Sequence, residues 1–123
     1  MKPRRVVVTG LGALTPIGNN ISSFWQGLIN GRSGAAPITY FDASKFKTHF
    51  ACEIKNFDPL NHFDRKEARK YDRFAQYALV STKEAIEDSK LDLEKIDKDR
   101  VGVIWGAGIG GLETFQNEVL NFA

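Results

Sequence analysis

Two continuous apolar segments, each ended by a glycine, limit the folds that are open to this sequence. The first reads RRVVVTG at 4–10 and the second reads RVGVIWG at 100–106. Apolar runs that do not alternate with polar residues predict strands covered on both faces, as in a parallel sheet between helices. With a shorter predicted strand between these two segments, strands and helical patterns alternate along the chain in the order β-α-β-α-β-α. We therefore predict an α/β layered fold with a largely parallel central sheet.

Three longer helices are predicted from the spacing of apolar residues. Residues 21–29 carry one apolar stripe, with Asn20 as a candidate N-cap and Gly31 as a candidate C′ residue. Residues 73–89 form the longest helix, and small residues on its apolar face would let another backbone approach closely. Residues 112–122, after a glycine-rich turn, form the third helix.

Shorter elements are predicted between these helices. Residues 31–48 are rich in turn-forming residues and predict a long loop, and residues 50–55 alternate as a short, half-buried strand. Asp64 and Glu67 have the spacing of a capping box, which predicts a helical turn near Arg65. Two central strands with few others to flank them suggest part of a larger α/β unit.

Composition excludes several classes of protein. The 123 residues contain 42% apolar residues and one cysteine, so an internal disulfide framework is ruled out. No apolar run approaches the ~18 residues of a membrane span, and the basic start lacks a signal-peptide core. The net charge of +2 is too small to argue for nucleic acid. We expect a globular, cytoplasmic protein that interacts with neither membrane nor nucleic acid.

The small net charge conceals two charged blocks. Residues 65–73 carry five basic and two acidic side chains, whereas residues 84–100 carry seven acidic and four basic ones. Such a dipolar arrangement can select a charged partner. The charge pattern alone favours a simpler interpretation, in which both blocks are solvated helix faces.

The glycine-rich turn at 106–111 has two interpretations. Its sequence, GAGIGG, matches G-x-G-x-x-G between a strand and a helix, the setting of a dinucleotide-binding turn. The acidic residue that completes this fingerprint would lie about 20 residues further on, beyond Ala123. We therefore favour a turn that lets a backbone or a ligand come close, and keep a nucleotide-binding or non-catalytic α/β module as the alternative.

No group with the features of a nucleophile or a metal ligand set is evident. Cys52 lies in the alternating segment beside Glu53, away from any helix N-terminus that would favour a thiolate, and is expected to be a small buried residue. His49 and His62 lack metal-ligand spacing and are expected on the surface or in loops. The sequence predicts no catalytic residue, metal or cofactor in this chain.

Four segments occur in one order and at one spacing: RRVVVTGLGALTPIG, FDASKFKTHFA, RKEARKYDRFAQYAL and VGVIWGAGIGGLETF. Together they resemble the amino-terminal part of the β-ketoacyl-[acyl-carrier-protein] synthase II family of thiolase-fold condensing enzymes in fatty acid synthesis. The likeness covers essentially the whole chain. It implies that residues 1–123 form a partial amino-terminal thiolase-like domain, with a mixed, mainly parallel central sheet. Trp105 departs from the small residue that the family pattern leads us to expect.

The resemblance also implies an activity and its location. Enzymes of this family are homodimers that load an acyl chain on a cysteine and use two histidines to decarboxylate malonyl-carrier protein and condense it with the acyl group. These three residues lie beyond Gly106 in the family, outside this sequence, so we expect this chain alone to be inactive.

Two sets of residues in this chain match functional positions of the family. One set belongs to the acyl pocket, where the Ile109 position forms the floor and influences the accepted chain length. The other belongs to the basic patch that receives acidic acyl carrier protein, in its acyl- and malonyl-loaded forms. The acyl-pocket candidates are Gly108, Ile109 and Leu112, and the carrier-protein candidates are Lys66, Arg69 and Lys70.

Overall fold

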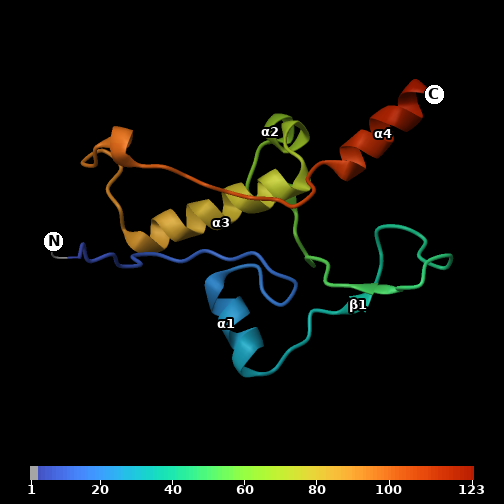
Figure 1. Ribbon diagram of the computed structural model, residues 1–123, viewed down its shortest axis with the longest axis horizontal. Coiled ribbons are helices and arrows are strands. Elements are labelled where there is room, and N and C mark those ends of the chain that lie inside the picture. Colours follow the sequence, from blue (N-terminus) through green and yellow to red (C-terminus); the bar gives the residue numbers. More distant parts are fainter. Residues whose placement is uncertain (1–2) are drawn as a thin grey trace.

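A long helix, α3, lies at the centre of the computed structural model, which describes residues 3–123 (Figure 1). The other elements surround it: α1 and a short hairpin on one side, α2 near its first turn, and α4 projecting away at the end of the chain. The elements are α1 (Ile21–Ile29), β1 (Ala36–Pro37), β2 (Phe50–Ala51), η1 (Pro59–Asn61), α2 (Arg65–Lys70), α3 (Arg73–Ser89), η2 (Lys98–Arg100) and α4 (Leu112–Phe122). Within residues 3–123, no helix combines the length and the apolar character needed to cross a membrane.

Helix α1 confirms both of its predicted ends. The Asn20 side chain accepts a hydrogen bond from Ser23 N at 2.8 Å, and Asn20 N donates to Ser23 Oγ in return. At the other end, Gly31 has φ +61°, and Arg32 N donates to Gly27 O while Gly31 N donates to Leu28 O. This pair of bonds is a Schellman motif, which ends the helix where glycine tolerates the left-handed conformation.

The N-terminal segment lies along the small-residue face of α3. A Cβ at Gly10 would overlap the Ala85 carbonyl, and a Cβ at Gly12 would overlap the Ser81 carbonyl. Ser81 is buried by this approach. The prediction that small residues on α3 admit another backbone is confirmed, because only glycine leaves room for the two chains at this distance.

Glu84 of α3 binds the loop between the N-terminal segment and α1 through hydrogen bonds. Its two carboxylate oxygens accept hydrogen bonds from Ala13 N at 2.9 Å and from Ile21 N, in the first turn of α1, at 2.8 Å. One turn further along, Asp88 accepts from Leu11 N at 2.9 Å. These two members of the acidic block therefore bind backbone N–H groups, rather than forming part of a purely solvated face.

Replacing Glu84 with Gln is expected to loosen this loop. The amide keeps one acceptor oxygen but places an NH2 group against the other backbone N–H. The hydrogen bond lost there has a charged acceptor, and its loss costs about 2 kcal/mol. Amide hydrogen exchange at Ala13 and Ile21 in the full-length protein should then accelerate about 30-fold. Glu87→Gln is the control, because Glu87 makes only an exposed 3.9 Å ion pair with Lys83. Exchange rates equal to those of the control would contradict the role of Glu84.

The two long segments predicted as central strands are extended but unpaired. Residues 4–10 and 100–106 run along α3 without a ladder between them, although both line one cavity of about 340 Å³ with α3 (Figure 1). Within residues 3–123 the only sheet is therefore β1 with β2, which is antiparallel, and the mainly parallel sheet expected of this region is not formed there. A strand is completed by a hydrogen-bonded neighbour, and among the described residues neither segment has one.

The apolar side chains of both segments are largely uncovered. Ile104 is 98% exposed and Val6 is 91% exposed, and no apolar side chain among residues 3–123 is fully buried. Continuous apolar sequence of this kind is suited to burial on both faces. Its exposure here matches the expectation that these residues belong to a larger α/β unit.

The predicted strand at 50–55 is shorter and less buried than expected. Only Phe50 and Ala51 pair, in antiparallel register with Pro37 and Ala36. Phe50 and Cys52 point to an exposed face, so the prediction that Cys52 is buried is wrong. The alternation correctly placed the two side chains on one face, but no described element covers that face.

Candidate functional site

A cavity of about 430 Å³ lies where α2 ends and where α3 and α4 begin. Two sets of residues that were predicted from the sequence to have separate roles meet around it. From the basic set, Arg69 and Lys70 line the cavity, and from the apolar set, Ile109 and Leu112 do so. Lys66 and Gly108 are not part of its lining. The structure therefore places a cationic rim and an apolar wall around one opening.

The cationic rim comes from the short helix α2. Asp64 begins the helix by accepting a hydrogen bond from Glu67 N at 2.7 Å, which confirms the predicted start at Arg65. The side chains of Lys66, Arg69 and Lys70 are all exposed, and within residues 3–123 none of the three forms an ion pair. Their positive charge is thus available to a partner.

A buried glutamine attaches α2 to α3. Gln76 is 4% exposed, and its Nε2 donates hydrogen bonds to Ala68 O at 2.8 Å and to Tyr71 O at 3.0 Å. These carbonyls lie at the end of α2, where the helix has no internal donors for them. Sequence reasoning missed Gln76, because glutamine in a helix is usually exposed and nothing in its spacing distinguishes it.

The apolar wall comes from the glycine-rich turn before α4. A Cβ at Gly110 would lie 2.7 Å from the Phe74 ring, and a Cβ at Gly111 would lie 2.9 Å from Asp72 Oδ2. Gly111 also has φ +71°, which side-chain-bearing residues rarely adopt. The second half of the turn therefore needs glycine for close approach to α3, whereas Gly106 and Gly108 face open space.

Between these glycines, Ile109 carries the bulky side chain. It is 78% exposed and lines the cavity beside Leu112. Gly110 is packed against the Phe74 ring, which limits movement of the backbone toward α3 at this point. The side chain at position 109 is thus one of the groups that border the open part of the cavity.

The first turns of α3 and α4 are joined by polar contacts. The Thr114 hydroxyl donates a hydrogen bond to Asp72 Oδ1, and Arg73 Nε lies 3.8 Å from Glu113 Oε2. A hydrogen bond with Tyr77 is the main cause that raises the pKa of Arg73, so this side chain keeps its positive charge. Arg73 also lies over the Tyr40 ring, 5.2 Å from its centroid.

These contacts argue against the nucleotide-binding alternative. A dinucleotide site places a phosphate at the helix N-terminus after the glycine turn. In this structure the Asp72 carboxylate lies at that N-terminus, against Gly111 and Thr114. A second anion there would be repelled, so the turn serves close packing with α3 instead.

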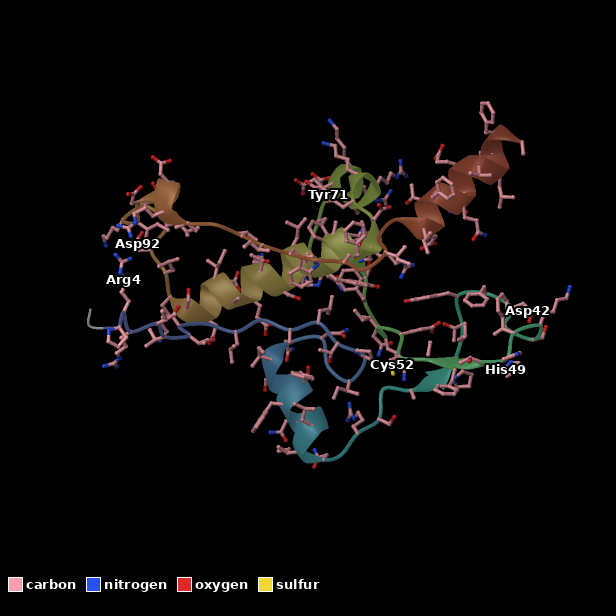
Figure 2. All side chains as sticks on the ribbon, viewed as in Figure 1. Arg4, Asp42, His49, Cys52, Tyr71 and Asp92 are labelled. Atoms are coloured by element: carbon pink, nitrogen blue, oxygen red, sulfur yellow. The ribbon has the colours of Figure 1, made fainter. Side chains whose placement is uncertain are left out.

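The cysteine and the two histidines lie apart from this cavity. Cys52 and His49 belong to the hairpin side of the molecule, whereas Tyr71 marks the cavity at the end of α2 (Figure 2). His62 is exposed, as predicted, and its ring stacks on Phe57 with centroids 5.5 Å apart. His49 is also exposed, as predicted.

Comparison with known sequences supports the resemblance found in the four segments. Residues 3–121 match the family described as "Beta-ketoacyl synthase, N-terminal domain". The chain is 48% identical over 118 residues to 3-oxoacyl-[acyl-carrier-protein] synthase 2 of Synechocystis sp., covering 96% of this chain and 28% of that protein. It is 48% identical over 113 residues to the protein of the same name from Staphylococcus aureus, covering 92% and 27%. The chain thus spans little more than a quarter of these relatives.

Comparison with solved structures supports the predicted fold class. The ishigamide ketosynthase/chain length factor superposes with a TM-score of 0.65 and 36% identity, over 76% of this chain and 23% of that one. A ketosynthase solved in complex with its type II PKS acyl-carrier protein superposes with a TM-score of 0.71 and 27% identity, over 94% and 31%. The path of this chain is therefore that of the amino-terminal part of a ketosynthase.

Proposed function

We propose that the full-length protein is a 3-oxoacyl-[acyl-carrier-protein] synthase of fatty acid elongation. The premise is that this chain belongs to the β-ketoacyl synthase family, whose N-terminal domain residues 3–121 match. Such an acyltransferase receives an acyl group on its cysteine, releases CO2 from malonyl-carrier protein and joins the resulting carbanion to the acyl carbon. The observation that carries the proposal is the 48% identity, over nearly the whole chain, to proteins with that name.

In this proposal residues 1–123 form a partial domain that binds the substrate and limits the length of its acyl chain. This domain does not perform the chemistry. Ile109 limits the depth available to the acyl chain, with Leu112 beside it and the uncovered backbone at Gly108 next to it. The cavity of about 430 Å³ has the size of a ligand site. The bond-forming cysteine and histidines belong to the rest of the enzyme, and no cofactor is needed.

The proposed partner is acyl carrier protein, loaded with an acyl or a malonyl group. The basic residues Lys66, Arg69 and Lys70 form no ion pair among the described residues and present positive charge that an acidic protein would complement. A related ketosynthase has been solved with its own acyl-carrier protein, which supports this class of partner. We further propose that the full-length enzyme is a homodimer in the cytoplasm, as the family resemblance and the cysteine usage suggest.

The proposal is tested by assaying the full-length enzyme for 3-oxoacyl product with acyl- and malonyl-carrier protein. Cys52→Ala should leave turnover within about twofold of the parent, because Cys52 is exposed beside β2 and lies at no helix N-terminus that would activate its thiol. The isolated 123-residue chain should form no product. A loss of 100-fold on replacing Cys52, or condensation by the isolated chain, would contradict the proposed division of roles.

A further inference from the structure

We propose that Asp72 is a positioning residue that holds the first turn of α4 in place and thereby fixes Ile109 at the cavity. The inference rests on the proposed function, in which Ile109 limits the length of the acyl chain. Asp72 is assigned no contact with the substrate. Its effect reaches Ile109 through Thr114, Gly111 and the backbone between them.

The side chain of Asp72 does not serve its own helix. Asp72 is the N-cap residue of α3, with extended backbone at φ −60° and ψ 156°, yet it makes no side-chain cap hydrogen bond. An aspartate at this position ordinarily accepts a bond from the second or third N–H of its helix. Here its Oδ1 accepts instead from the Thr114 hydroxyl of α4, 42 residues away.

Helix α4, in turn, lacks a cap of its own. It starts from Gly111, which has no side chain and makes no side-chain cap hydrogen bond. The first N–H groups of a helix are unpaired and carry partial positive charge, so a carboxylate near them is stabilising. Asp72 supplies this carboxylate from the neighbouring helix, with Oδ2 against Gly111 and Oδ1 on Thr114.

Two neighbours of Asp72 add further contacts between the start of α3 and the start of α4. Arg73 forms the ion pair with Glu113, and the Phe74 ring lies against Gly110. Three consecutive residues, the N-cap Asp72 and the first two residues of α3, therefore contact the segment from Gly110 to Thr114, directly after Ile109. The exposed ion pair contributes little by itself. The hydrogen bond from Thr114 is the directional contact, and its loss would free the turn that carries Ile109.

The test uses the full-length enzyme and the ratio of kcat/KM for C14 and C6 acyl primers. Thr114→Val removes the donor with little change in volume, and Asp72→Ala removes the acceptor. Both should raise the ratio at least fivefold, because a freed Ile109 no longer limits long chains. Thr114→Ser keeps the hydroxyl and should restore the parental ratio. Glu118→Gln, which removes a charge elsewhere on exposed α4, should leave the ratio unchanged.

A double variant separates positioning from general destabilisation. If the two residues act through one bond, Thr114→Val should add nothing to the ratio in an Asp72→Ala background. A ratio within twofold of the parent, or equal losses for both primers, would overturn the inference. Ile109→Phe in the same assay tests the proposed function separately. If it shifts the ratio while Thr114→Val does not, only the role of Asp72 fails.

Discussion

Ile109→Phe in the full-length enzyme is expected to lower kcat/KM for a C14 acyl primer about 100-fold relative to a C6 primer. The added ring would fill space at the cavity that only the longer chain uses, and each excluded methylene loses ~0.8 kcal/mol of apolar burial. The next residue, Gly110, is packed against Phe74, where an added Cβ would lie 2.7 Å from the ring, and this packing limits how far the turn can shift to make room. Steady-state kinetics with C6, C10 and C14 primers measure the effect.

The converse substitution provides the control for this prediction. Ile109→Val removes one methylene and should favour long primers modestly, since it deepens the same space. If Ile109 instead only packs the start of α4, Phe should lower the melting temperature and reduce activity equally with all three primers. A uniform loss across the three lengths would therefore contradict the role of Ile109 in chain-length selection.

The helices could be predicted from sequence because the signals that bound them are local. The Asn20 cap and the Gly31 terminus lie within one turn of α1, and the predicted bounds agree with the structure. The same holds for Asp64 before α2. Bonds between residues three or four apart depend on nothing that lies elsewhere in the chain.

The strands were predicted less well, for the opposite reason. Residues 4–10 and 100–106 have the composition of central strands, but a strand is completed by a neighbour that its own residues do not specify. The predicted burial of Cys52 is wrong for the same reason. The alternating pattern predicts which face of the strand the side chain occupies, but not whether another element covers that face. Periodicity orients side chains, whereas packing depends on the rest of the fold.

The candidate site combines both kinds of information. The resemblance supplied Ile109 and the basic residues, but their meeting at one cavity depends on contacts between residues about 40 positions apart. Asp72 makes such a contact, whereas Gln76 holds α2 against α3 and Glu84 holds the loop before α1. Side chains of all three types are common on solvated helix surfaces. No local pattern distinguishes a helix carboxylate that holds a distant backbone from one that faces water.

Reversing the charge of Lys66, Arg69 and Lys70 together, each to Glu, is expected to raise the KM for carrier-protein substrates about 100-fold at low salt. Each reversal replaces an attraction with a repulsion worth about 1 kcal/mol at an exposed site, and 1.4 kcal/mol corresponds to a factor of ten. Because all three side chains are exposed on one short helix, α2 should still form. KM is measured with acyl-carrier protein and with a small thioester mimic. The KM for the mimic should change less than twofold.

The salt dependence distinguishes lost docking from lost folding. In the parent, KM for carrier protein should rise with ionic strength, because charges in water are screened beyond ~10 Å at 0.1 M salt. In the triple variant this dependence should weaken or reverse. Lys45→Glu, on the exposed loop between β1 and β2, is the matched control and should leave KM nearly unchanged. Equal damage to carrier-protein and mimic substrates would show that the reversals disturb the junction of α2 with Gln76, and would contradict the proposed docking surface.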